Sequence, residues 1–311
     1  MLSTTHGSKP VFLTFILVTL IVILYYSYSN NNNNNAEEKV QLCESNPFLR
    51  HFNRQIIEEY EKKWLDWKRK HFTKTFQFLK NYAQTSGKVL GDFPMIVNPS
   101  MPILPCSDLK RYGNSRDTGK QLCELKSLSV DDRCIVYSLG SNNDFQFEQA
   151  ILSQTHCLVH TFDCTSSPPK NSQPRLTFHN ICLGENSPLQ EHIYPQSGKS
   201  LTKLNNTKFM KFDEILQMTK HTRIHVLKMD IEGGEYSVFA DLLENSNRLE
   251  LPFQISFESH WWNKDIYHSI LHMALFEQLF QSGYRLLQYE LNEGDRSCVE
   301  WTFLRVFCQT N

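Results

Sequence analysis

The residues best placed to do chemistry follow an apolar run at residues 134–139, which has the β-branched and aromatic composition of a buried strand. Gly140 comes next and permits a sharp turn in which the backbone lies close to another group. The first turns of a helix are predicted at residues 145–152. This order offers backbone N–H groups and the positive end of a helix dipole to a ligand carboxylate or phosphate. The turn itself is made of residues that favour turns and helix N-caps: Ser141, Asn142, Asn143 and Asp144.

Asp163 ends a second apolar run, residues 157–162, and an acid at such a strand tip can bind both hydroxyls of a ribose. It follows Gly140 at close to the roughly 20-residue spacing of nucleotide sites. Asn142 and Phe145 stand where G-x-G-x-x-G has its second and third glycines, which disfavours NAD. A single glycine with polar turn residues is more typical of sites for S-adenosylmethionine (SAM). The alternative is an ordinary βαβ unit that binds no ligand.

The elements that must position these residues alternate in the manner of an α/β sheet. After Asp163, strands are predicted at residues 175–183, 225–229 and 252–257, and helices at residues 212–220, 236–244 and 266–281. Two final strands, residues 284–289 and 298–307, are joined by N-E-G-D, which is typical of a β-hairpin. We therefore predict an α/β, Rossmann-like, seven-stranded sheet of the class I methyltransferase type, with helices on both faces.

The segment K-M-D-I-E-G-G-E at residues 228–235 resembles the K-x-D-x-E-G-x-E signature of the FkbM-like SAM-dependent methyltransferases. Three further segments are similar to the animal methyltransferase-like family allied to them: Y-S-L-G-S-N-N-D-F-x-F-E, F-H-N-I-C-L-G and F-E-S-H-W-W. The resemblance covers roughly residues 106–307. Each segment alone is a weak signal, but their combination is fairly specific.

The resemblance implies a SAM site at the carboxyl ends of the strands. Its cofactor-binding residues would be Gly140, Ser141, Asn142, Asp144, Asp163, Asn180, Ile181 and Asp230. In this assignment the Gly140 turn lies under the methionine part of SAM, and Asp163 binds the ribose. Asn180 and Ile181 lie beside the adenine, and Asp230 faces the transferred methyl group.

Methyl transfer to a hydroxyl or amine also needs a group that removes the acceptor proton. The candidate catalytic residues follow the fourth and fifth strands: Asp230, Glu232, Glu258 and His260. His260 has the most suitable unperturbed pKa, with a surface or packed histidine as the alternative. The three carboxylates could instead hold a divalent cation or cap helices, but we predict no metal. Trp261 and Trp262 could stack on a sugar or aromatic acceptor, or cover the end of the sheet.

Residues 11–28 form an apolar run without a charge, whose length lies between that of a membrane span and that of a signal-peptide core. We predict an uncleaved signal anchor, with cleavage before Asn30 and secretion as the alternative. Lys9 before the run and Glu37 and Glu38 after it place the N-terminus in the cytosol and the rest in the secretory lumen. The predicted order is a cytosolic stub (1–10), the anchor (11–28), a stem (29–47), a helical and irregular extension (48–132) and a methyltransferase domain (133–309).

Within the extension, apolar residues recur every three or four positions from about residue 47 to residue 82, which predicts an amphipathic helix. We expect it to pack on the domain or to hold the domain off the bilayer, with binding to a membrane surface or a partner as the alternative. Residues 91–132 are rich in Pro, Gly and other turn residues, and predict an irregular segment that forms a lid or an N-terminal extension.

All nine cysteines follow the apolar run, and in an oxidising lumen some should pair. Their odd number leaves at least one outside an intramolecular disulfide. We predict a disulfide between Cys106 and Cys123. Buried free thiols are expected at the cysteines of predicted strands: Cys134, Cys157, Cys182 and Cys308.

Composition bounds the partners. The formal net charge is −1, without the basic excess of a nucleic-acid surface, so we expect no nucleic-acid partner. Asn205-Asn206-Thr207 is a glycosylation sequon if the domain is lumenal.

These features predict a membrane-anchored, lumenal, SAM-dependent O-methyltransferase that acts on a glycan or a small hydroxylated acceptor. A non-catalytic methyltransferase-fold scaffold that has lost SAM binding is the alternative from a different class. A glycosyltransferase would need a D-x-D motif, for which Asp131-Asp132 and Asp230-Ile231-Glu232 are poor substitutes.

Overall fold

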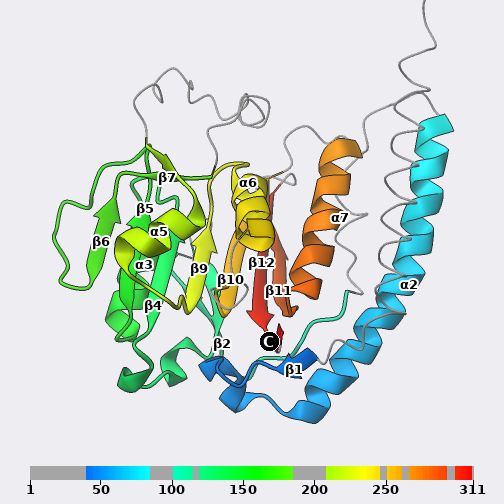
Figure 1. Ribbon diagram of the computed structural model, residues 1–311, viewed down its shortest axis with the longest axis horizontal. Helices are drawn as coiled ribbons and strands as arrows, with labels where there is room; N and C mark the ends of the chain where they lie inside the picture. Colours follow the sequence, from blue (N-terminus) through cyan, green and yellow to red (C-terminus); the bar gives the residue numbers. More distant parts are fainter. Residues whose placement is uncertain are drawn as a thin grey trace, which may run out of the picture.

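The centre of the molecule is a seven-stranded sheet in the order β11-β12-β10-β9-β4-β5-β6 (Figure 1). The computed structural model describes residues 40–84, 101–114, 119–184, 208–245, 251–260, 266–292 and 298–309. The strands of the sheet are β4 (Ile135–Leu139), β5 (Leu158–Phe162), β6 (Leu176–His179), β9 (Val226–Met229), β10 (Gln254–His260), β11 (Tyr284–Leu291) and β12 (Cys298–Arg305). Strands β10, β9, β4, β5 and β6 are parallel to their neighbours in this series, and β12 pairs antiparallel with both β10 and β11. This confirms the predicted Rossmann-like arrangement with a closing hairpin.

The order of the strands shows where the chain changes direction along the sheet. The chain moves from β4 outward to β5 and β6, then crosses back to β9 on the other side of β4. Such a switch point is where open α/β sheets bind ligands, outside the carboxyl ends of the strands. All four residues of β9 are buried, as expected for a parallel strand covered on both faces.

Helices cover the sheet. In Figure 1, α5 (Phe212–Thr219), α6 (Glu235–Ala240) and α7 (Ile266–Gln281) lie in front of the strands. Helix α3 (Gln146–Gln154) connects β4 to β5, where the chain moves the opposite way along the sheet. Because such crossovers are right-handed, α3 belongs to the opposite face. The predicted helix at 236–244 is divided, since α6 continues as a π-helical turn, η6 (Asp241–Asn245).

Part of the predicted lid is regular instead. Strands β2 (Leu109–Tyr112) and β3 (Lys120–Cys123) form an antiparallel hairpin. The prediction of an irregular segment at 91–132 is therefore wrong for this part. The hairpin lies against the sheet. The side chain of Gln254 exchanges two hydrogen bonds with the backbone of Cys123 (2.7 and 2.9 Å), and Thr302 Oγ1 donates to the carbonyl of Gln121 (2.8 Å). Cross-sheet contacts of this kind are invisible to local sequence patterns.

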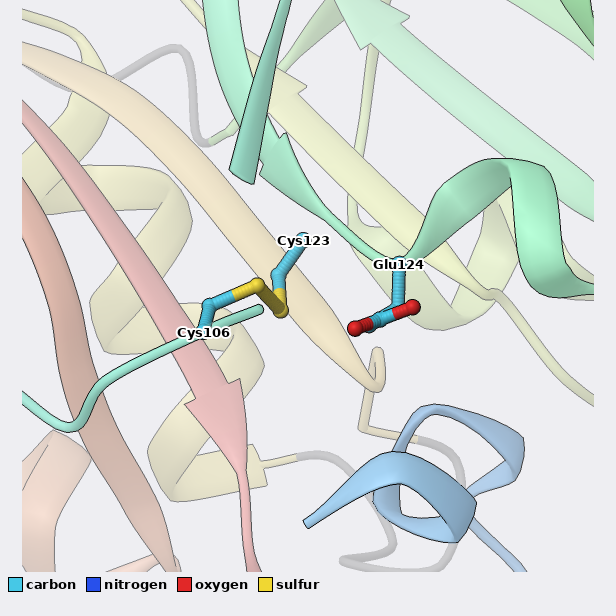
Figure 2. A group of neighbouring side chains, drawn as sticks. All are labelled: Cys106, Cys123 and Glu124. Atoms are coloured by element: carbon cyan, nitrogen blue, oxygen red, sulfur yellow. A yellow bond between two sulfur atoms is a disulfide. The ribbon is translucent and has the colours of Figure 1, made fainter. Parts of the chain in front are cut away.

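The hairpin is tied down at its base by the predicted Cys106–Cys123 disulfide, which the structure confirms. Figure 2 shows this bridge beside Glu124, which follows β3 directly and accepts a hydrogen bond from Ser107. Short 3-10 turns, η3 (Leu125–Ser127) and η4 (Val130–Asp132), then lead into β4.

Eight of the nine cysteines form four disulfides, so the expectation of free thiols in the strands is wrong. The residues concerned form the pairs Cys134–Cys157, Cys164–Cys182 and Cys43–Cys308. Parallel pairing of β4 with β5 brings Cys134 and Cys157 together at the strand starts, which explains the first pair. Cys298 is a buried thiol, as the odd cysteine count required.

The two ends of the described chain meet. Strand β1 (Val40–Leu42) pairs antiparallel with β13 (Phe307–Gln309), next to the Cys43–Cys308 bridge. The 3-10 turn η1 (Pro47–His51) follows, with Asn46 as its N-cap.

The predicted amphipathic helix is confirmed as α2 (Arg54–Gln84). It packs on the domain beside α7 (Figure 1). Trp64 stacks on Phe280, with 5.4 Å between the ring centroids, and Lys68 forms an ion pair with Glu277 of α7. Packing of its described residues on the domain agrees with the first of the two interpretations of this helix.

One strand of the sheet differs from prediction. The strand expected at 175–183 is interrupted after His179, and its last residues form β7 (Cys182–Leu183), which pairs with β8 (Phe209–Met210).

Across the described ranges, no helix combines the length and apolar character needed to cross a bilayer. The predicted anchor, the sequon at Asn205, and Trp261 and Trp262 lie outside the described residues.

Candidate active site

Two turns meet at the carboxyl edge of the sheet, one after β4 and one after β9. Gly140 has a φ of +77°, and a Cβ added there would lie 1.9 Å from the carbonyl oxygen of Asp230. Only glycine therefore allows this approach. The prediction of a close backbone contact at Gly140 is confirmed, and the contact is with the turn after β9 that carries Asp230.

Asp163 lies under the Gly140 turn and binds it. Its Oδ2 accepts hydrogen bonds from the backbone N–H groups of Ser141 (2.7 Å) and Asn142 (3.0 Å) and from the hydroxyls of Ser141 and Ser166. Its Oδ1 accepts three more, from Thr165 and Ser166. Seven donors meet the roughly four lone-pair positions of one carboxylate. Burial alone would raise the pKa of Asp163, but these donors, Ser166 first, lower it to about 2.

This geometry matters for the predicted cofactor residues. The backbone N–H groups of Ser141 and Asn142 donate to Asp163, and that of Asn143 donates to Ser166 Oγ (3.0 Å). The donors that the sequence assigned to a ligand therefore hold the turn together. Ribose binding by Asp163 remains a prediction, and it requires the ribose hydroxyls to replace donors that the carboxylate already has.

The remaining predicted cofactor residues lie along the same edge. Asp144 accepts hydrogen bonds from the backbone and side chain of Gln146 at the start of α3 (both 3.0 Å). Asn180 is exposed and donates weakly to the carbonyl of Ser166 (3.4 Å), whereas Ile181 is buried. Their proposed places beside the adenine stay predictions.

Lys228 of the K-x-D-x-E-G-x-E segment explains how the two turns are joined. Its buried ammonium donates to the carbonyls of Leu139 (3.3 Å) and Gly140. It thus fixes the Gly140 turn to β9. The carboxyl of Glu148, buried in α3, accepts a hydrogen bond from Ser138 (2.6 Å), and burial raises its pKa.

A second group of charged residues surrounds Asp230. The side chain of Lys120, from the β2–β3 hairpin, is fully buried and donates to Asp230 Oδ2 (3.0 Å) and to Glu300. Burial alone would lower the pKa of Lys120, but Asp230 and Glu300 raise it above its usual value. Burial alone would raise the pKa of Asp230, yet Lys120, Lys228 and His260 hold it well below its usual range. Asp230 is therefore an ionised carboxylate at neutral pH.

His260 stands at the centre of the predicted catalytic residues. Its Nδ1 lies 3.1 Å from Glu235, and its Nε2 lies 3.7 Å from both Glu232 and Glu258 and 4.0 Å from Asp230. Burial alone would lower the pKa of His260, but Glu235, followed by Asp230 and Glu258, raises it to about 10. His260 is consequently an imidazolium at neutral pH, which corrects the expectation that its unperturbed pKa would suit it as the base.

Glu258 has the opposite character. It is 3% exposed, and burial, together with Asp230 and Glu300, raises its pKa to about 8. Asn292 Nδ2 donates to its Oε1 (3.0 Å). A carboxyl group whose pKa lies close to physiological pH is suited to exchange a proton with a substrate.

The structure thus brings together all four residues predicted for catalysis, because β9 and β10 are neighbouring parallel strands. Sequence reasoning missed three further members of the cluster: Lys120, Glu235 and Glu300. Glu235 had a signal, since it is the last residue of the recognised segment. Its carboxylate accepts hydrogen bonds from the backbone of Ile231 and Gly233 (both 2.9 Å) and so closes the turn after β9.

Oxygen, nitrogen and sulfur atoms of this cluster have metal-ligand spacing. Three sets lie within 4.8 Å: Glu258, His260 and Cys298; Asp230, Glu232 and His260; and Asp230, Glu258 and Glu300. A fourth set with this spacing, Cys106, Cys123 and Glu124, contains the disulfide of Figure 2 and so lacks free thiolates. In the third set the ammonium of Lys120 already lies between two of the carboxylates.

The parallel sheet, the glycine turn at its switch point and the acid after β9 define the class I methyltransferase architecture. Residues 44–305 match the family described as Methyltransferase domain. The chain therefore belongs to this family of SAM-dependent methyltransferases, and its cofactor is SAM. No curated protein matches the sequence.

Several solved structures share a distant likeness. A Streptococcus thermophilus protein described as a hemolysin is 9% identical, over 60% of this chain and 63% of its own, with a TM-score of 0.35. Aeropyrum pernix fibrillarin in complex with SAM is 15% identical, over 55% and 66%, with a TM-score of 0.29. Methanococcus jannaschii fibrillarin, a pre-rRNA processing protein, is 10% identical, over 64% and 84%, with a TM-score of 0.32. The chain thus spans slightly less than two thirds of the first two.

The residues at this edge fit a sulfonium cofactor. SAM carries a positive charge at its sulfur, and the carbonyl of Asp230 contacts the Gly140 turn while the Asp230 side chain is an ionised carboxylate. A negative group at the point where the two turns meet is electrostatically complementary to that charge.

Proposed function

We propose that this chain is an O-methyltransferase that acts on a glycan or a small hydroxylated acceptor in the secretory pathway. The observation that carries the proposal is the buried Glu258 carboxyl, whose pKa of about 8 is set beside an ionised Asp230 and a cationic His260. The FkbM-like motifs at residues 228–235 support the same activity.

The chemistry divides among these residues. Bound SAM supplies an electrophilic methyl group. Glu258 removes the proton of the acceptor hydroxyl, and Asp230 faces the reacting centre. His260 acts as a hydrogen-bond donor that keeps the acceptor oxygen oriented, because as an imidazolium it has no lone pair to accept a proton. Glu232, which is 41% exposed at its side chain, contacts the acceptor from the rim.

The compartment is part of the proposal. Four disulfides are typical of secreted and lumenal proteins. The uncharged run at residues 11–28 and the sequon at Asn205 agree with a type II membrane protein whose domain faces the lumen. We retain the predicted division into stub, anchor, stem, extension and domain.

The test is methyl transfer. Full-length protein expressed through the secretory pathway is incubated with SAM carrying a labelled methyl group and a panel of glycans and small hydroxylated compounds. We expect labelling of at least one acceptor by the wild type and loss of labelling in Glu258→Gln. The matched control is Glu58→Gln, an exposed carboxylate on α2 that pairs with Arg54. Labelling that survives Glu258→Gln would overturn the assignment of the base.

A second candidate function is supported by the Gly140 turn. Asp163 already accepts seven hydrogen bonds, three from Ser141 and Asn142 of this turn and four from Thr165 and Ser166 of its own loop, so the turn is complete without a ligand. A non-catalytic scaffold with a methyltransferase fold would have this property. Calorimetric titration with SAM beside the labelling assay separates the two candidates: a folded chain that binds SAM but labels no acceptor supports the scaffold.

A further inference from the structure

The three-carboxylate set of Asp230, Glu258 and Glu300 has the composition of a divalent cation site. Carboxylate oxygens are the ligands that Mg²⁺, Mn²⁺ and Ca²⁺ prefer, and one oxygen from each residue lies within 4.8 Å of the others. Glu258 is almost fully buried, and the side chains of Asp230 and Glu300 are each 18% exposed. Carboxylates this close repel one another unless a cation lies between them.

The cation present there is an amino-acid side chain. The side chain of Lys120 is 0% exposed, and its ammonium forms ion pairs with Asp230 and Glu300. Glu258 adds a further electrostatic attraction. A buried lysine is costly unless it is paired, and here it meets the same oxygens that a metal ion would use.

Lys120 does not belong to the seven-stranded sheet. It is the first residue of β3, and the hairpin that carries it is held at both ends. At its base the Cys106–Cys123 disulfide and the side chain of Gln254 fix it. Near its tip, Arg111 donates to the carbonyl of Gly119 (2.7 Å), the residue before Lys120, and pairs with Glu290 of β11. The chain therefore builds a rigid support whose end delivers one ammonium group to the acid cluster.

We propose that Lys120 is the resident cation of the acceptor site and takes the place of a divalent metal ion among Asp230, Glu258 and Glu300. Lys120 is a positioning residue: it holds the carboxylates together and makes methyl transfer independent of metal. The assignment of the cluster to an acceptor site rests on the proposed function, but the occupation of the cluster by a lysine does not.

The experiment is a titration with Mn²⁺ in which binding is measured as the decrease of the electron paramagnetic resonance signal of the free ion. Full-length wild type, Lys120→Ala, Lys120→Arg and the exposed-lysine control Lys126→Ala are compared. We expect no tight Mn²⁺ binding by the wild type, Lys120→Arg or Lys126→Ala. Lys120→Ala should bind Mn²⁺ at least about tenfold more tightly, because the net charge of the ligand set governs the affinity of such sites.

A merely structural role for Lys120 predicts loss of stability in Lys120→Ala without any gain of metal binding. The double variant Lys120→Ala with Glu300→Gln should lose the gained Mn²⁺ binding, which places the ion among these carboxylates. A folded Lys120→Ala that binds Mn²⁺ no better than the wild type overturns the proposal.

If Lys120→Ala does not fold, the wild type still decides the matter. Tight Mn²⁺ binding by the wild type that Glu300→Gln abolishes would show a metal site coexisting with the lysine, and would overturn the proposal. The titration uses neither SAM nor an acceptor, so its failure is distinct from a failure of methyl transfer.

Discussion

The two turns that meet at the carboxyl edge of the sheet are built on opposite principles. At the Gly140 turn, one carboxylate, Asp163, is surrounded by neutral donors from this turn and from its own loop, and its pKa falls to about 2. At the Asp230 turn, several carboxylates share two cations, and the pKa of Glu258 rises to about 8. Donors in excess make a rigid support, whereas acids in excess leave a proton available near neutral pH. On this basis we propose cofactor binding at the Gly140 turn and proton transfer at the Asp230 turn that adjoins it.

The largest expected effect comes from forcing the two turns apart. Gly140→Ala places a Cβ against the carbonyl of Asp230 at a positive φ, and should lower the free energy of unfolding by roughly 3–5 kcal/mol. Gly283→Ala is the matched control, since its Cβ would lie 1.9 Å from the carbonyl of Phe307, far from the site. Urea unfolding and SAM calorimetry should show that both variants lose stability but only Gly140→Ala loses SAM affinity. Equal SAM affinity in the two would show that the joint between the turns does not shape the cofactor site.

The next effect removes the available proton acceptor. Glu258→Gln should lower kcat roughly a hundredfold or more, because a positioned base contributes at least that much to proton transfer. SAM affinity should be unchanged, since Glu258 belongs to the Asp230 turn. Steady-state kinetics and calorimetry on the same preparation check both statements, and weakened SAM binding with an intact kcat would reverse the division of roles.

A smaller effect concerns acid stability. The pKa of Asp163 is depressed from 3.8 to about 2 in the folded chain. A depressed carboxyl pKa stabilises the fold above the unfolded pKa, and that contribution of about 2 kcal/mol is lost as the pH falls from about 4 through about 2. Asp163→Asn should lower stability at neutral pH by about this amount and remove this part of the pH dependence. Urea unfolding at a series of acid pH values tests it, and parallel curves for the two proteins would contradict it.

The smallest effect adjusts the base without removing it. Asn292 donates to Glu258, and a donor to the carboxylate favours its charged form. Asn292→Ala should therefore raise the pKa of Glu258 and move the alkaline rise of kcat/KM to higher pH. The lost hydrogen bond should also lower the free energy of unfolding by about 1 kcal/mol at neutral pH. A pH–rate profile measures the shift. A profile that keeps its midpoint would mean that another group controls the reaction.

The sequence was sufficient wherever chemistry follows strand order. Glu258 and Asp230 were grouped correctly because neighbouring parallel strands end at the same edge, and the final hairpin was evident from its turn residues. It was insufficient where long-range packing decides. Lys120 reaches the cluster because the β2–β3 hairpin packs against the sheet. No local sequence pattern predicts where this hairpin contacts the sheet. The charge of His260 follows from carboxylates contributed by separate segments, so its unperturbed pKa misled.

The contact between β1 and β13 has a mechanical consequence. The Cys43–Cys308 bridge joins the first and last parts of the described chain, and the seven strands lie within the covalent ring that it closes. A pull applied between residues 40 and 309 is carried by the sulfur–sulfur bond and leaves the strands of the ring without tension. If residues 11–28 anchor the chain, a force transmitted from the membrane enters the domain beside this bridge, and the Gly140 and Asp230 turns keep their spacing under load.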